Sequence, residues 1–195
     1  NIGTINEKQI FNGLNLTIHD GDFITVIGGN GAGKSTMLNL IAGVHKADGG
    51  RIILDGEDLT YKNETQRAKY IGRVFQDPMM GTAPTMMIEE NLAMAYRRTK
   101  RRTLAWGISQ KERELYRDSL SQLGLGLEDR MKTKVGLLSG GQRQAVTLLM
   151  ATLQKPKLLL LDEHTAALDP ATSAKVLQLS DQIIRDHQLT ALMVT

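Results

Sequence analysis

The residues of this chain best suited to chemistry begin with a glycine-rich loop at residues 28–36, of sequence GGNGAGKST. Glycines let successive backbone N–H groups curl around an anion, and the start of a following helix adds favourable partial charge. Lys34 can then reach the β- and γ-phosphates of a nucleotide, and the Ser35 hydroxyl can ligate Mg²⁺. The pattern therefore predicts an ATP phosphate site, whose expected contacts are Gly28, Asn30, Gly31, Ala32, Gly33, Lys34, Ser35 and Thr36.

Two adjacent carboxylates, Asp162 and Glu163, follow the apolar run at residues 158–161. Ligands of open α/β sheets bind at the carboxyl ends of the strands, so this position suits a reacting group. Asp162 is expected to hold Mg²⁺ through water, and Glu163 to polarise the attacking water as general base. By itself the pattern is weak, because buried strands often end in solvated acids.

A third pattern is LSGGQ at residues 138–142. A serine and two glycines at a predicted helix start make another N-terminus that can receive an anion. A helix merely capped by serine fits equally well on physical grounds alone. The order of the three patterns decides the matter: a phosphate loop, then LSGGQ, then a strand ending in two acids resembles the ATPases of ABC transporters, whose signature motif is LSGGQ.

The resemblance implies further roles along the chain. Gln76 resembles the family's glutamine that touches Mg²⁺ and the attacking water and that lies beside the transmembrane partner. Residues 167–169 resemble the loop that crosses the dimer interface through Asp169. The family forms a head-to-tail homodimer that sandwiches two ATP molecules. The implied set is Glu163, Lys34 and Gln76 for catalysis, Ser35, Gln76 and Asp162 for Mg²⁺, and Ser139, Gly140, Gly141, Gln142 and Asp169 for nucleotide contact from the second copy.

The sequence departs from the family in several places. His164 stands where proline is usual, and we interpret it as a tolerated turn residue rather than a catalytic one. The family's switch histidine falls beyond Thr195, and its adenine-stacking aromatic falls upstream of Ile10, so the domain is expected to be trimmed at both ends. Phe11 is assigned to the core instead. The basic run at residues 97–102 is either a solvated loop or a contact with a partner or with anionic lipid headgroups.

The elements that must position these residues follow from periodicity and punctuation. The fold class expected from them is α/β, and the resemblance implies its architecture: a P-loop NTPase core (residues 1–84 and 136–195) with an ABC-type antiparallel β subdomain and an α-helical insert at about residues 85–135, all in one domain. Ser109 and Glu112 match a capping box at a helix start in the insert. Strands are predicted at residues 14–18, 23–27, 51–54, 71–75, 158–161 and from 192, and helices at 35–43, 142–154 and 173–186.

Composition narrows the class further. The chain has 195 residues, no cysteine and a net charge of +3, which excludes disulfide frameworks and Cys-ligated metals and gives no sign of nucleic-acid binding. No stretch is long and apolar enough to span a bilayer, and the first residues lack the features of a signal peptide.

We therefore expect an ATP-hydrolysing subunit, peripheral on the cytoplasmic face of the membrane. It would energise solute transport, in the import direction, through transmembrane permease subunits and, through them, an extracytoplasmic solute-binding protein. The alternatives are non-transport ABC ATPases of DNA repair or translation. The first usually carry very long coiled coils between the phosphate loop and the signature, and the second usually carry two ATPase modules in one chain. The short interval here, without sustained heptads, favours transport.

Overall fold

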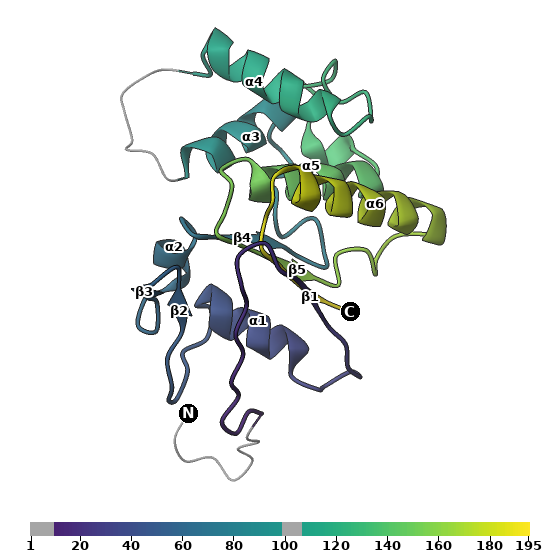
Figure 1. Cartoon of the computed structure of the whole chain (residues 1–195). Helices are drawn as coiled ribbons and strands as arrows, with labels where there is room; N and C mark the ends of the chain where they lie inside the picture. Colours follow the sequence, from purple (N-terminus) through teal and green to yellow (C-terminus); the bar gives the residue numbers. More distant parts are fainter. Residues whose placement is uncertain (1–9, 99–106) are drawn as a thin grey trace.

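Four parallel strands form the sheet around which the chain is arranged (Figure 1). The computed structural model describes residues 10–98 and 107–195. Register pairs place Val26 beside Val194, Val194 beside Asp162, and Val74 beside Leu161, so the carboxyl ends of all four strands meet at one edge. In spatial order the strands are β1 (Phe23–Val26), β6 (Ala191–Val194), β5 (Leu158–Asp162) and β4 (Ile71–Val74).

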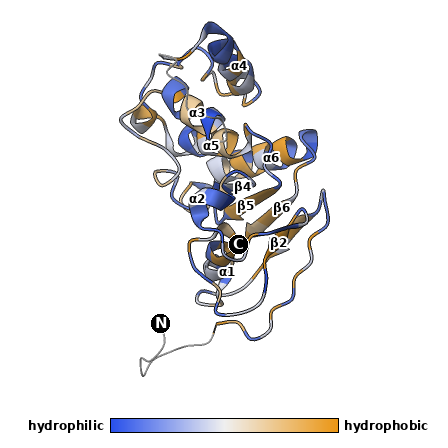
Figure 2. Ribbon diagram, turned by 90° about the vertical axis from the view of Figure 1, so that its left-hand side faces the viewer, coloured by the Kyte–Doolittle hydropathy of each residue, from blue (hydrophilic) through white to orange (hydrophobic). Residues whose placement is uncertain are grey.

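The sheet is covered by helices on both faces, which explains why β5 is apolar along its whole length. Leu158 and Leu160 join the cluster that contains the buried side of α1 (Lys34–Ala42). Leu159 and Leu161 join the cluster beneath α5 (Gly140–Thr152) and α6 (Pro170–Asp186). Figure 2 shows the apolar strands enclosed between these helices.

A helical layer lies beyond α5 and contains most of the remaining helices (Figure 1). The segment comprises α3 (Ile88–Arg97), α4 (Gln110–Ser121) and the 3-10 helix η1 (Val135–Leu137). The core cluster that contains the buried side of α5 also contains three fully buried residues of this layer, Leu92 of α3 and Tyr116 and Leu120 of α4. Both α-helices fall within the stretch where the sequence predicted helices.

The second, smaller sheet is an antiparallel pair, β2 (Ile53–Leu54) and β3 (Glu57–Asp58). It is followed by the short helix α2 (Glu64–Arg67). Arg67 is buried and donates hydrogen bonds to the carbonyl oxygens of Leu40 and Ile41. These bonds satisfy carbonyls at the end of α1 and fix α2, which follows the small sheet, to the core.

The predicted strand at residues 14–18 is wrong. Those residues belong to no strand, and Leu14 and Leu16 are 55% and 45% exposed. Their alternation is real, but within residues 10–98 and 107–195 no neighbouring strand pairs with them, and alternation without a partner does not make a sheet. The helix predicted from residue 173 begins three residues earlier, because Asp169 caps it and Pro170 occupies its first position.

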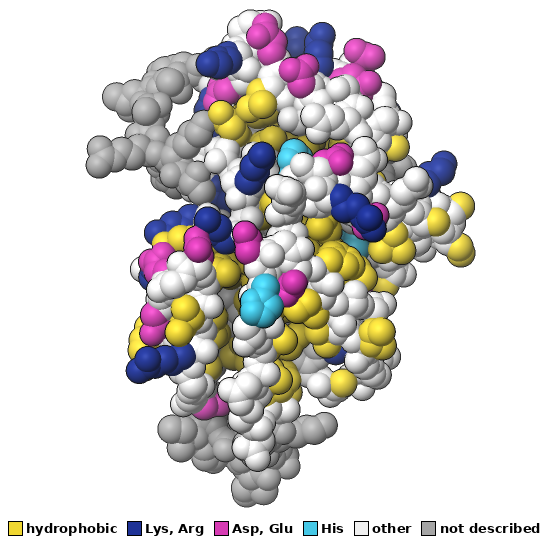
Figure 3. Space-filling model, viewed as in Figure 1, with side chains coloured by type: hydrophobic (Ala, Val, Ile, Leu, Met, Phe, Trp, Pro, Cys, Tyr) yellow, Lys and Arg dark blue, Asp and Glu magenta, His cyan; other side chains and the backbone are white. Residues whose placement is uncertain are grey.

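Charged side chains of both signs are interspersed on the face shown in Figure 3, over the helical layer at the top and over the region of the small sheet and α2 at the left. The structure contains no helix, in the parts of the chain it describes, with the length and apolar character needed to cross a bilayer.

Candidate nucleotide site

The phosphate loop connects β1 to α1 and depends on glycine at its end. Gly33 adopts φ +90°, and a Cβ placed there would lie 2.6 Å from Cγ2 of Ile10. Any side chain would therefore meet both backbone strain and a steric clash. Gly33 caps α1 without a side-chain hydrogen bond, so the helix start remains available to an anion. Phe11 packs against the core cluster, as predicted.

Lys34 joins this loop to the end of β5. Its ammonium donates to the carbonyl oxygen of Gly28 at 2.5 Å and lies 3.5 Å from Oε1 of Glu163. The Lys34 side chain is only 8% exposed. Glu163 has φ +41°, a left-handed conformation, and its N–H donates to the carbonyl of Val194. A strained backbone held by a sheet hydrogen bond thus aims this carboxylate at the loop lysine.

Ser35 and Asp162 face one another beside that pair. The Ser35 hydroxyl donates to Oδ1 of Asp162 at 3.3 Å, and Arg73 donates to Oδ2 at 3.2 Å. A hydroxyl and a carboxylate oxygen that converge in this way suit Mg²⁺, which prefers few protein oxygens and keeps phosphate and water ligands. The described residues hold no cluster of three or more His, Cys, Asp or Glu side chains able to bind a metal. The donor set fits Mg²⁺ bound with a nucleotide better than a free-standing metal centre.

Gln76 lies two residues beyond the end of β4, the strand that pairs with β5. Val74, the last residue of β4, pairs with Leu161, so Gln76 follows β4 at the same edge of the sheet at which β5 ends. The Gln76 side chain is exposed. This edge therefore gathers the loop, both acids and the glutamine from three segments distant in sequence.

The signature loop forms the start of α5. Ser139 caps the helix, since its hydroxyl accepts from the Gln142 N–H and its own N–H donates to Oε1 of Gln142. A Cβ on Gly140 would lie 3.0 Å from Leu168, and one on Gly141 would lie 2.3 Å from Thr172. The two glycines therefore let the signature loop pack closely against the start of α6.

Asp169 caps α6 and accepts a hydrogen bond from the Thr172 N–H at 3.0 Å. That interaction with Thr172 holds the pKa of the Asp169 carboxyl below its usual range. In the described parts of the chain no hydrogen bond or ion pair joins residues 139–142 or Asp169 to the phosphate loop. The structure thus brings together Lys34, Ser35, Asp162 and Glu163, and none of the polar contacts in the described parts of the chain joins the signature loop to them.

His164 lies in the predicted turn, but it is buried, with 2% of its surface exposed. Its Nε2 lies 3.0 Å from Oγ of Ser180, and the Ser180 hydroxyl donates to the carbonyl of Val176. Nε2 must therefore carry the hydrogen of this bond. Burial lowers the pKa of His164 to about 4, so the ring is neutral at neutral pH.

Two features were not predicted from the sequence. Arg73 contacts Asp162 directly, and its only signal was an arginine inside the otherwise apolar run at residues 71–75. The first arginine of the basic run, Arg97, forms an ion pair with Glu112 at 2.7 Å, whereas Arg98 is exposed. The rest of that run lies outside the described residues.

Relatives of this chain are found among ATP-binding proteins of transport systems. The chain is 46% identical to a tyrosine transport ATP-binding protein of Clostridioides difficile over 96% of its length, and spans 74% of that protein. It is 40% identical to a methionine import ATP-binding protein of Pseudomonas putida over 97% of its length, and spans 55% of it. A dimeric ATP-binding cassette in a post-hydrolysis state, bound to ADP and Pi, superposes with a TM-score of 0.79 at 29% identity, covering 95% of this chain and 79% of that one.

The match to a family extends across most of the described chain. Residues 11–166 fit the ABC transporter family, from the segment before β1 to the turn after β5. This stretch contains the phosphate loop, Gln76, the signature loop and both acids. The chain belongs to the ABC transporter family, as an ATP-binding subunit that hydrolyses ATP.

Proposed function

We propose that this chain binds ATP together with Mg²⁺ and that hydrolysis energises uptake of a small solute through separate transmembrane subunits. The observation that carries the proposal is the convergence of Lys34 with Glu163 at 3.5 Å and of Ser35 with Asp162 at 3.3 Å, at the carboxyl edge of the parallel sheet. The ammonium of Lys34 and the hydroxyl of Ser35 thus meet two carboxylates at the edge where open α/β sheets bind ligands.

Each loop residue has a distinct part in the proposed reaction. Backbone N–H groups of residues 28–36 and the start of α1 bind the phosphates, and Lys34 adds a charge-assisted hydrogen bond. Ser35, Asp162 through water, and Gln76 would hold Mg²⁺, and the bound ion would supply positive charge that offsets the charge of the phosphates.

Glu163 is the proposed general base. In the structure its carboxylate is engaged by Lys34. When Lys34 turns to the phosphates, Glu163 is released to accept a proton from the attacking water. Nucleotide binding would thus free the Glu163 carboxylate from its ion pair with Lys34, so that it can act as the base.

The second half of each site comes from another copy of the chain. Ser139, Gly140, Gly141 and Gln142 at the start of α5, with Asp169 beside them, form the proposed surface that closes on a nucleotide held by the partner's phosphate loop. A head-to-tail homodimer is supported by the dimeric structure of a related ATP-binding cassette, and within one chain no described hydrogen bond or ion pair joins these residues to Lys34. The two glycines keep the start of α5 close to Leu168 and Thr172, so the signature loop and the Asp169 loop would move as one surface.

The partners follow from the family and its relatives. The relatives named for import act on different solutes, methionine in one case and spermidine and putrescine in another. Because similar ATP-binding proteins serve different solutes, this subunit would supply energy. Recognition of the solute would belong to the permease and to an extracytoplasmic binding protein. We place the chain at the cytoplasmic face of the membrane, with the helical segment at residues 85–135 as a subdomain that responds to the permease.

The test separates binding from chemistry with two variants. Lys34→Ala should weaken ATP binding about 10- to 100-fold, because a charge-assisted hydrogen bond is lost. Glu163→Gln should leave affinity near wild type and lower turnover by roughly 10²- to 10⁴-fold, the contribution of a general base. Nucleotide affinity and phosphate release are measured on the same preparations.

Lys46→Ala serves as the control, because Lys46 is an exposed lysine beyond the end of α1. It should change neither quantity. Equal turnover of wild type and Glu163→Gln would show that Glu163 is not the general base. An unchanged ATP affinity of Lys34→Ala would show that Lys34 of the phosphate loop does not bind the phosphates.

A further inference from the structure

Arg73 is a charged residue in the middle of β4, where its neighbours Gly72 and Val74 are buried. Along a strand successive side chains alternate between faces. Ile71 and Leu160 belong to the cluster on the α1 face, so Arg73 and Asp162 project on that same face of the sheet. The register places Arg73 beside Leu160, two residues before Asp162. The arginine reaches forward along the strand, and its Nη2 lies 3.2 Å from Oδ2 of Asp162.

This ion pair is largely shielded from water. The side chains of Arg73 and Asp162 are 12% and 13% exposed. The guanidinium also lies over the ring of Phe75, with its central carbon 4.6 Å from the ring centroid. Shielding strengthens the interaction of this charge with its neighbours, because the local dielectric constant is lower than that of water.

Within the described residues, the two acids at the end of β5 each form an ion pair with one basic residue, and these basic residues differ in kind. Glu163 pairs with Lys34, which lies on the phosphate loop and is needed by the nucleotide. Asp162 pairs with Arg73, which lies on the sheet and is held by Phe75. Arg73 uses Oδ2 of Asp162, whereas Ser35 uses Oδ1. The arginine can therefore keep its contact while the other oxygen serves a metal.

The hydrogen-bonding pattern of Arg73 points to charge as its contribution. Among the described residues its buried Nε–H has no hydrogen-bond partner, although the guanidinium offers five N–H donors. The contact that Arg73 does make, from Nη2 to Oδ2 of Asp162, is a hydrogen bond between opposite charges, which is stronger than one between neutral groups. The positive charge beside Asp162 is the feature that this arrangement preserves.

We propose that Arg73 is a resident counter-cation of the Asp162 carboxylate that lowers the dependence of nucleotide binding on Mg²⁺. The proposal rests on the role of Asp162 in holding Mg²⁺ proposed above. A fixed positive charge next to Asp162 opposes the approach of a divalent cation to that carboxylate. The same charge offsets repulsion between the acids and an anionic nucleotide when no metal is present. Arg73 thereby replaces part of the electrostatic work of the metal.

The experiment measures the affinity of the full chain for a fluorescently labelled ADP in excess Mg²⁺ and in EDTA. The quantity of interest is the ratio of the dissociation constant in EDTA to that in Mg²⁺. For Arg73→Leu we expect this ratio to rise about tenfold or more, because removal of the charge weakens metal-free binding and favours the metal. Arg73→Lys, which keeps the charge, should stay close to the wild-type ratio.

Arg113→Leu is the matched control. Arg113 forms an ion pair of similar length, 3.0 Å, with the buried carboxylate of Glu89 in the helical layer. Its loss should leave the ratio unchanged. In the double variant Arg73→Leu/Asp162→Asn the carboxylate charge is also removed. Its ratio should be close to that of Asp162→Asn alone, because Arg73 then has no carboxylate charge to offset.

Two results would overturn the proposal. Equal weakening of both affinities by Arg73→Leu would give Arg73 a structural role only, and weakening confined to Mg²⁺ would mean that it orients Asp162 for the metal. Where the leucine variant does not fold, Arg73→Gln removes the charge while keeping a donor, and the same criteria apply. A wild-type ratio of one would instead contradict the proposed Mg²⁺ site itself.

Discussion

At the scale of single residues, the side chains around the reacting edge are held by a few buried polar contacts. His164 follows Glu163 directly and is tied to α6 through Ser180. Because the Ser180 hydroxyl donates to Val176, it accepts from His164 Nε2, and both groups are satisfied. The turn that carries the proposed general base is thereby fixed to the helix behind it.

Removal of this acceptor should be costly. In Ser180→Ala the buried Nε2–H of His164 loses its partner, and we expect the free energy of unfolding to fall by about 1–3 kcal/mol. Ser119→Ala is the control, because Ser119 also donates to a carbonyl four residues back, that of Leu115, but lies on the partly exposed side of α4. Its effect should stay within about 0.5 kcal/mol. Urea unfolding of both variants at pH 7 gives the comparison, and equal effects would show that the His164–Ser180 bond contributes nothing specific.

Residue types singled out Lys34, Ser35, Asp162 and Glu163, and the structure brings these four side chains to one edge of the sheet, because a loop followed by a helix and a strand followed by acids have fixed places in an α/β fold. Their roles toward a nucleotide stay predictions. The burial of His164 and the contact between Arg73 and Asp162 could not be predicted in this way. Both depend on which side chains the packed elements bring near them, α6 for His164 and β5 for Arg73. Such partners are 16 and 89 residues away in sequence, beyond the reach of local pattern.

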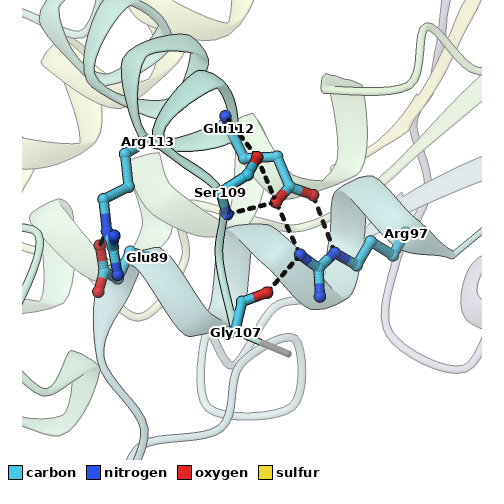
Figure 4. A network of polar contacts seen from close by, with 6 residues as sticks. All are labelled: Glu89, Arg97, Gly107, Ser109, Glu112 and Arg113. Carbon is cyan, nitrogen blue, oxygen red and sulfur yellow. Dashed lines mark hydrogen bonds and ion pairs between the residues drawn. The ribbon is translucent and has the colours of Figure 1, made fainter. Parts of the chain in front are cut away.

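At the scale of elements, the start of α4 shows how a local signal becomes a tertiary contact. Ser109 and Glu112 form the capping box that the sequence predicted. Glu112 also binds Arg97 at the end of α3, and Arg97 donates to the carbonyl of Gly107 (Figure 4). One carboxylate therefore caps α4 and joins it to α3. The pairing with Arg97, helped by hydrogen bonds from Ser109, holds the pKa of Glu112 at about 2.

This lowered pKa gives a pH dependence whose sign is fixed. A carboxyl whose pKa is depressed in the folded state stabilises the fold above its unfolded pKa, near 4.5, and that contribution is lost as pH falls from there towards about 2. Glu112→Gln should therefore be less stable than wild type at pH 7, and the difference should narrow at pH 4 and further at pH 3. Thermal or urea unfolding at the three values measures it.

The matched control for that series is Asp118→Asn, an exposed acid on the same helix. The stability of Asp118→Asn should stay close to that of wild type at every pH. If the stability difference between Glu112→Gln and wild type did not become smaller as the pH is lowered, the Arg97 contact would not depend on the charge of the carboxylate.

Periodicity predicted most elements well, because β5 and the long helices bury wide apolar surfaces. It failed at residues 14–18, where alternation is present but a partner strand is not. Boundaries shifted where a cap decided them, as at Asp169 and Pro170. Capping is decided by single side chains, so it moves helix starts by a few residues without changing the architecture.

At the scale of the whole molecule, the order of the motifs was enough to identify the class of fold, and the way in which the chain completes its site remains a proposal. The phosphate loop and both acids share one edge of the sheet, whereas Ser139 caps α5 and packs with α6. Within one chain these two groups make no described hydrogen bond or ion pair. A composite site formed by two copies explains why both are present.

Mixing of two inactive variants tests this composite site. Lys34→Ala disables the phosphate loop, and Ser139→Arg disables the signature loop. In a homodimer of either variant both sites are therefore inactive. In a heterodimer the intact phosphate loop of one copy meets the intact signature loop of the other. An equimolar mixture in which half the dimers are mixed should therefore recover about a quarter of wild-type ATP hydrolysis, since one of two sites is restored in each.

The decisive control is a mixture of Lys34→Ala with Glu163→Gln. Lys34 and Glu163 contact each other within one chain and belong to the same half of the site. In their heterodimer one site lacks the lysine and the other lacks the general base, so neither is restored and hydrolysis should remain at the level of the parents. Recovery in the Lys34→Ala and Ser139→Arg mixture but not in this one would support sites shared between copies. Equal activity of both mixtures would mean that each chain completes its site alone, and that the signature loop acts within its own subunit.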